Sequence, residues 1–220
     1  MVIEQLISPI VPTLLPSDTG TRALFLMEEN NLTQLPLVVE HKYMALVQEN
    51  DVLDLDNTVS PLSAGDLFDY KPAVFASGHP FEALRVAHQQ NLSIVPVVDN
   101  QNTYLGSITR NDLLKYITEN SGLDSPGGIL VLEIEPRNYS LHEIARICES
   151  EDVIIISTQL FTNRDSGKIE VTIKTNRNDL AGVVQAFERY NYVVKEVFGE
   201  QNSHEDLLDR YKLLMNYINM

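Results

Sequence analysis

Apolar positions between residues 73 and 119 follow a pattern that predicts alternating strands and helices. Ile94–Val98 is a continuous, mostly β-branched apolar run between Asn91 and Asp99, which is typical of a buried strand. Pro80 suits the first turn of a helix, which we expect to extend to Gln90. The other expected elements are strands over residues 73–75 and 104–108 and a helix over residues 110–119. Together they make a strand–helix–strand–strand–helix unit.

The same pattern occurs twice. The sequence LPLVV at residues 35–39 is echoed by VPVVD at residues 95–99, a spacing of 60. The sequence LVQEND at residues 46–51 matches SITRND at residues 107–112, a spacing of 61, so one residue is gained in the intervening hairpin. A unit of this size buries too little apolar surface alone, whereas two units related by a pseudo-twofold axis bury a common core. We therefore expect residues 1–60 and 61–122 to be two units of one domain.

A Pro- and Gly-containing segment at residues 121–128 marks a boundary before a second domain, residues 128–200. Ser140 and Glu143 have the spacing of a capping box at the start of a helix over residues 140–150. Strands are expected over residues 129–135, 153–162, 168–175 and 192–198, and a second helix from Asp179 to Tyr190. The predicted order is βαββαβ, and the fold class of the whole chain is α/β, of the α+β kind.

Residues 203–219 predict a C-terminal helix with one apolar stripe, formed by Leu207, Leu208, Tyr211, Leu214, Met215 and Ile218. An apolar stripe of this kind normally packs against another surface. It would cover the sheet of its own chain, pair with the same helix of a second copy in a dimer, or bind a helix of a target protein.

Composition and charge exclude several classes of function. The chain has 44% hydrophobic and 21% charged residues, no run of about 18 apolar residues and no basic N-terminal region, so we expect a cytoplasmic protein without a membrane span. With a net charge of −15 and no basic stripe, binding to nucleic acid or to an anionic membrane is not expected. Cys148 is the sole cysteine and is expected to be a core residue rather than a nucleophile. His79 and His88 are too isolated for a metal site.

Candidate chemistry gathers at the start of the helix expected over residues 110–119. Thr109 has a hydroxyl and an N–H at a helix start, where the helix dipole favours a phosphate, and Asp112 is an acceptor able to take two hydroxyl groups. Arg110 could add a charge-assisted bond to phosphate if it turns inward. The alternative is that Thr109 and Asp112 only cap the helix. In the first unit Asp51 keeps the acidic position but Gln48 replaces the threonine, so one ligand per chain is expected rather than two.

Residues 92–99 and 106–114, LSIVPVVD and GSITRNDLL, resemble the signature of cystathionine-β-synthase (CBS) domains. The resemblance covers both units. It implies a Bateman module, in which clefts between the units bind AMP, ADP, ATP or S-adenosylmethionine. In such a module the pair Thr109 and Asp112 would bind the phosphate and the ribose. It also implies adenine contacts at Ala73, Val74 and Pro96, for which the alternative is plain core.

The βαββαβ order of residues 128–199 resembles ferredoxin-like ACT domains. Many of these bind amino acids through a glycine-bearing loop after the first strand. Here that loop is PRNYS at residues 136–140, which has no glycine, and Tyr139 would obstruct a ligand. Asn138 is the remaining polar candidate. A helix cap and a sheet used for dimerisation are the alternative.

A CBS pair followed by an ACT-like domain resembles small bacterial regulators that include acetoin-utilisation proteins. The sequence therefore predicts a non-catalytic, homodimeric regulator that binds an adenosine-containing ligand, requires no cofactor and acts on an unidentified protein partner. The alternative is a ligand-free scaffold that works through protein contacts. An enzyme would need a nucleophile with a base, or a metal cluster, and the sequence shows neither.

Overall fold

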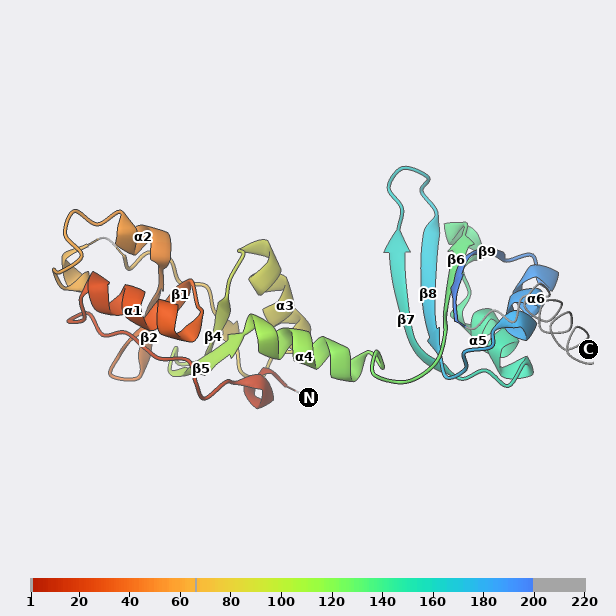
Figure 1. Ribbon diagram of the computed structural model, residues 1–220, viewed down its shortest axis with the longest axis horizontal. Helices are drawn as coiled ribbons and strands as arrows, with labels where there is room; N and C mark the ends of the chain where they lie inside the picture. The colour runs from red at the N-terminus through yellow and green to blue at the C-terminus, as the bar shows by residue number, and fades with distance from the viewer. Residues whose placement is uncertain (1, 66, 200–220) are drawn as a thin grey trace, which may run out of the picture. The chain divides into compact units, whose positions relative to one another are not determined.

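The computed structural model describes residues 2–65 and 67–199, and the contacts of the chain divide into two units, residues 1–117 and 118–220 (Figure 1). The two units are therefore described separately.

In the first unit, the two halves of the repeat each contribute a small sheet flanked by helices. Strand β1 pairs with β2, and β4 pairs with β3 and β5. The elements are α1 (Gly20–Asn30), β1 (Gln34–Val39), β2 (Lys42–Gln48), α2 (Glu49–Leu53), β3 (Val74–Phe75), α3 (Pro80–Gln89), β4 (Ile94–Val98), β5 (Tyr104–Thr109) and α4 (Arg110–Asn120).

The strand register reproduces the repeat of the sequence. Gln34 pairs with Gln48 in the first half, and Ile94 pairs with Thr109 in the second. Each hairpin has an irregularity at the same place, after Leu37 and after Val97. The prediction of a tandem unit is therefore confirmed at the level of individual residue pairs.

The first half departs from the predicted order in two places. Its first strand is reduced to a single parallel bridge between Leu14 and Leu37. Its second helix, α2, has 5 residues, whereas α4 has 11. After α2, Asp56 and Asn57 stand at the positions where α4 continues with Ile117 and Thr118, so one apolar position of the longer helix is lost.

The second unit has the predicted βαββαβ order. Its antiparallel sheet has the strand order β7-β8-β6-β9, which is the ferredoxin-like arrangement. The elements are β6 (Ile129–Ile134), α5 (Leu141–Ser150), β7 (Ile155–Thr162), β8 (Ile169–Thr175), α6 (Ala181–Arg189) and β9 (Val193–Phe198). Ser140 caps α5 as predicted, accepting a hydrogen bond from the Glu143 N–H at 3.3 Å.

One core holds the second unit together. Alternate residues of β6 and β8, such as Leu132 and Ile173, are fully buried together with Ile147 of α5 and Phe187 of α6. Both helices therefore cover the same face of the sheet, which leaves the other face for solvent or a partner.

The predicted C-terminal helix at residues 203–219 lies outside the described residues. Within the described part of the chain, no helix has the length and apolar content needed to cross a bilayer.

Candidate functional site

Thr109 and Asp112 bind each other at the junction of β5 and α4. The Thr109 hydroxyl oxygen accepts a hydrogen bond from the Asp112 N–H at 3.1 Å. In return, Asp112 Oδ2 accepts the Thr109 N–H at 3.0 Å and the Thr109 hydroxyl at 2.5 Å. This is a reciprocal capping box. In the structure the pair therefore caps α4, as the alternative interpretation of the sequence anticipated.

Arg110 is tied to the loop between α3 and β4. Its Nε and Nη2 atoms donate to the carbonyl of Leu92 at 3.1 and 2.8 Å, and Nη2 also donates to Asn91 Oδ1 at 3.2 Å. Its backbone N–H donates to the carbonyl of Ser93 at 2.9 Å. The guanidinium is thus held at a fixed position beside the start of α4.

A polar hollow of about 480 Å³ adjoins these residues. Three segments from both halves of the repeat line it: Asn30, Asn31, Leu32 and Thr33 at the end of α1; Asn91 and Ser93 after α3; and Thr109, Arg110 and Asn111 at the start of α4. The lining has hydroxyl and amide groups and one cation, Arg110, and it contains no carboxylate. In a chain with a net charge of −15, such a lining is suited to an anion.

A hydrogen-bond network centred on the buried Gln34 joins the two halves of the repeat beside the hollow. Gln34 is 6% exposed, and its Oε1 accepts bonds from the Ser93 N–H at 2.7 Å and the Ser93 hydroxyl at 2.6 Å. The Thr33 N–H donates to Ser93 Oγ at 3.1 Å. These bonds tie the loop after α1 to the loop after α3, and both loops line the hollow.

Two asparagines end the helices that lead into the hollow. Asn31 and Asn91 follow α1 and α3 with φ of 53° and 51°, in the left-handed region that asparagine tolerates better than most residues. The two asparagines are 60 residues apart and occupy the same position in the two halves of the repeat. The position of Asn91 directly after the helix predicted to end at Gln90 was the available signal.

The corresponding site in the first half of the repeat has the opposite charge. Glu49 occupies the position of Arg110, and its N–H donates to the carbonyl of Thr33 at 3.0 Å just as that of Arg110 donates to Ser93. Gln48 Nε2 donates to Asp51 Oδ2 at 3.2 Å in place of the threonine–aspartate box. A carboxylate where the second half has a guanidinium disfavours an anion, so the two halves are not equivalent sites.

The residues expected at adenine are part of the core. Val74 is 6% exposed and pairs with Val97 across β3 and β4, Pro96 is buried within β4, and Ala73 packs against the same cluster. None of the three is among the residues that line the hollow. Their contact with adenine stays a prediction.

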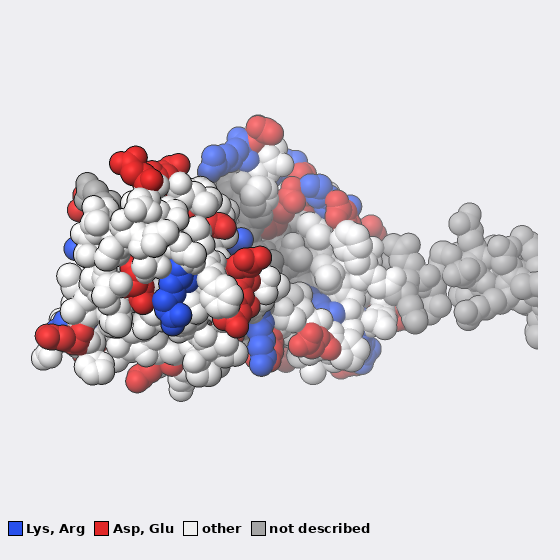
Figure 2. Space-filling model, turned by 60° about the vertical axis from the view of Figure 1, so that its left-hand side comes forward, with Lys and Arg blue, Asp and Glu red and all other residues white. Residues whose placement is uncertain are grey.

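Cys148 is 1% exposed, and burial raises the pKa of its thiol to about 11. The thiol is therefore neutral near pH 7, which makes it a weak nucleophile. Among the described residues, no group of three or more His, Cys, Asp and Glu side chains is placed to hold a metal ion. On the face shown in Figure 2, the Lys and Arg side chains are scattered among acidic ones.

The loop after β6 borders a second hollow, of about 430 Å³, in the second unit. Asn138 lines it together with three carboxylates, Glu133, Glu135 and Glu143. Lys168 Nζ is 2.6 Å from Glu133 Oε1 and is therefore paired within the protein. The three carboxylates outnumber the one lysine and would repel the carboxylate of an amino acid. This adds to the obstruction expected from Tyr139.

The CBS domain family matches residues 3–57 and 65–119, which together are half of the chain. The chain belongs to the CBS domain family. The two matched segments correspond to the two halves of the repeat, so the first unit is a CBS pair. The resemblance of the second unit to ACT domains stays a prediction beyond its ferredoxin-like strand order.

Several solved structures are similar to part of the chain. A CBS domain pair/ACT domain protein from Thermotoga maritima is 22% identical over 54% of this chain and 98% of its own, with a TM-score of 0.47. A Vibrio cholerae protein described as an acetoin utilization protein is 22% identical over 56% of this chain and 95% of its own, with a TM-score of 0.48.

A further similar structure is that of CBSX2 in complex with AMP, which is 22% identical over 54% of this chain and 96% of its own, with a TM-score of 0.47. At these values the similarities assign neither ligand nor partner to this chain. The family assignment rests on the two CBS matches.

Proposed function

We propose that the CBS pair is a regulatory module that binds one adenosine-containing ligand per chain, in the hollow beside Thr109 and Asp112. The observation that carries this proposal is the lining of the hollow, which offers Arg110, hydroxyls and amides but no carboxylate. Its volume of about 480 Å³ lies in the range of about 300–1,000 Å³ typical of small-molecule sites.

The chemistry of the lining favours a ligand with phosphate. The first turn of α4 has the positive end of a helix dipole, Thr109 supplies a hydroxyl, and Arg110 is the one lining cation. AMP, ADP and ATP meet this requirement, whereas S-adenosylmethionine has a sulfonium cation and no phosphate. We therefore rank the adenine nucleotides above S-adenosylmethionine. Asp112 is not one of the residues that line the hollow. It follows the lining residue Asn111 and would accept the ribose hydroxyls once it is released from its capping box with Thr109.

Binding through this pair requires a local rearrangement. Thr109 and Asp112 donate and accept within their own capping box, so a ligand that uses them exchanges intrachain bonds for ligand bonds. Such an exchange alters the start of α4. A regulator needs two conformations that bind the ligand with different affinity. We propose that these two conformations differ at the start of α4, which is capped by Thr109 and Asp112 in one and uncapped in the other. A cytoplasmic homodimer and an unidentified protein partner complete the proposal.

A thermal-shift screen of the full chain tests the proposal. A ligand present at 100 times its Kd stabilises the fold by about 2.7 kcal/mol, which corresponds to a rise in Tm of roughly 5–10 °C. We expect this rise with AMP, ADP or ATP, its loss in Asp112→Ala, and its retention in the matched variant Asp51→Ala. An equal rise in both variants would place the ligand elsewhere.

A ligand-free scaffold is the second candidate, and one observation favours it. The side chains of Thr109, Asp112 and Arg110 all have hydrogen-bond partners within the chain. If neither the nucleotides nor S-adenosylmethionine changes Tm at millimolar concentration, the protein is better explained as a ligand-free scaffold than as a ligand-binding regulatory module.

A further inference from the structure

We propose that the ligand of the CBS pair is an acyl adenylate, that is, AMP whose phosphate carries an apolar acyl group, and that an apolar groove beside the polar hollow binds the acyl chain. This inference rests on the proposed function and names the chemical class of its ligand.

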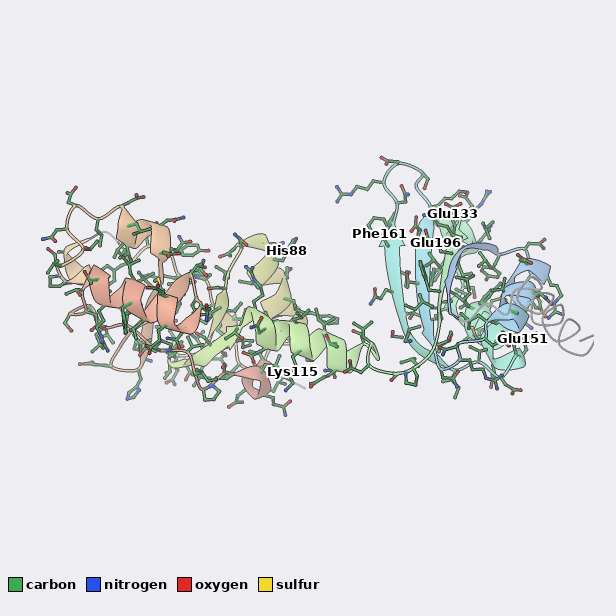
Figure 3. All side chains as sticks on the ribbon, in the orientation of Figure 1. His88, Lys115, Glu133, Glu151, Phe161 and Glu196 are labelled. Carbon is green, nitrogen blue, oxygen red and sulfur yellow. The ribbon has the colours of Figure 1, made fainter. Side chains whose placement is uncertain are left out.

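The apolar groove lies between α3 and α4 and has a volume of about 330 Å³. Figure 3 labels His88 on α3 and Lys115 on α4, the two helices that form its walls. Five apolar residues of these helices line it: Leu84, Ala87, Leu113, Leu114 and Ile117. The groove therefore offers apolar surface and enough room for a short hydrocarbon chain.

Asn91 and Arg110 connect the groove with the polar hollow, because each of them lines both. Their side chains are bonded to each other, since Nη2 of Arg110 donates to Oδ1 of Asn91 at 3.2 Å. The polar hollow and the apolar groove are therefore adjacent, with the guanidinium at their border.

This border is where the proposed function places a phosphate. The bonds from Arg110 to Leu92 and Asn91 use its Nε and Nη2 atoms. Among the described residues no acceptor is bonded to Nη1, so this atom can donate to a phosphate oxygen. A substituent on that phosphate then begins at the border and continues into the groove.

The lining of the groove favours an apolar substituent over a further phosphate. Of its lining residues, only Arg110 and His88 are ionisable. A β-phosphate placed in the groove would lose hydration against leucine and isoleucine side chains, without a second arginine or a lysine to pair with it. An acyl chain in the same place removes apolar surface of both ligand and protein from water. An acyl adenylate meets the requirements of the hollow and of the groove together.

The groove belongs to the same half of the repeat as the proposed phosphate contacts. Its wall α4 has 11 residues, whereas α2 has 5, and Asp56 stands at the position of Ile117. Leu84 of α3 nevertheless has a close counterpart, Leu24 of α1, because both leucines are partly buried and each packs against a core cluster of the first unit. Leu24 therefore provides a matched control for Leu84.

Two stable esters of AMP, in which an alkyl group replaces the reactive acyl group, test the inference on the full chain. Adenosine 5′-methylphosphate and adenosine 5′-butylphosphate have the same charge and differ by three methylene groups, so isothermal titration compares them directly. Full burial of one methylene group strengthens binding about fourfold. Because Leu114 is 63% exposed, the groove is open to solvent on that side. We therefore expect the butyl ester to bind about tenfold more tightly than the methyl ester, rather than by the full factor for three methylenes.

The variants Leu84→Ala and Leu24→Ala assign this difference to the groove. Both remove the same atoms from equivalent helices, and circular dichroism shows whether both are folded. We expect Leu84→Ala to reduce the advantage of the butyl ester to less than about threefold, and Leu24→Ala to retain it.

Three results would overturn the inference. If wild type binds AMP but has equal affinity for the two esters, the acyl site is wrong while the proposed function stands, and the groove is left to a protein contact. An advantage of the butyl ester that is unchanged in Leu84→Ala would place its alkyl chain elsewhere. If neither AMP nor either ester binds, the proposed function fails together with the inference.

Discussion

At the scale of single residues, Asp112 stabilises the protein before any ligand binds. It accepts both the backbone N–H and the hydroxyl of Thr109, whereas Asp51, its counterpart, accepts from the side-chain amide of Gln48. We expect Asp112→Ala to lower the free energy of unfolding by about 1 kcal/mol, the usual contribution of a helix cap, and Asp51→Ala to lower it by less. Urea unfolding of the two variants measures the difference. An equal loss of unfolding free energy in both variants would show that the capping box of Asp112 stabilises the fold no more than the single hydrogen bond of Asp51 does.

Tyr192 should make the second unit sensitive to alkaline pH. Burial, and next its hydrogen bond to Glu143, raises the pKa of Tyr192 from 10.0 to about 12. Because the folded-state pKa is raised, the neutral phenol stabilises the fold fully below pH 10, and that stability is lost as the pH rises toward 12. We therefore expect the stability advantage of wild type over Tyr192→Phe to shrink between pH 9 and pH 11, two values that bracket the onset of the loss. Urea unfolding at both pH values tests this, and an unchanged advantage would contradict it.

At the scale of elements, the left-handed asparagines set the ends of α1 and α3. Replacing Asn31 or Asn91 by alanine places a Cβ-bearing residue without a compensating side chain at φ of 53° or 51°. We expect each alanine variant to lose about 1 kcal/mol of stability, and each glycine variant to retain or exceed wild-type stability. Thermal unfolding of the four variants checks this. A loss in Asn91→Gly as large as in Asn91→Ala would instead point to the bond between Asn91 and Arg110 as the stabilising contact.

The sequence predicted elements well where local pattern and tertiary context agree. Strand β4 was predicted to the residue because a continuous apolar run lies between two turn-forming residues, and the proximity of Thr109 and Asp112 follows from their spacing of three at a helix start. The hollow itself could not be predicted. Its lining joins Asn30–Thr33 with Ser93 and Thr109 only because β1 and β4 come together in the folded unit. The short α2 also escaped prediction, because the repeat suggested a helix as long as α4.

At the scale of the whole molecule, the CBS pair and the second unit should respond differently to ligand. The contacts of the chain divide between residues 1–117 and 118–220, and the first unit has two core clusters whereas the second has one. Because the proposed site lies entirely in the first unit, a nucleotide should raise the melting temperature of that unit and leave the other unchanged. Differential scanning calorimetry with and without AMP would show this as one shifted and one fixed transition. Two transitions that move equally would indicate coupling of the second unit to the site.

The proposed site holds one nucleotide per chain, at Thr109 and Asp112. Isothermal titration of the full chain with AMP, ADP and ATP tests it most directly, with Asp112→Ala and Asp51→Ala as the paired variants and circular dichroism to confirm that both are folded. We expect one binding event per chain, retained in Asp51→Ala and lost in Asp112→Ala. Two events per chain, or binding that is unchanged in Asp112→Ala, would contradict it.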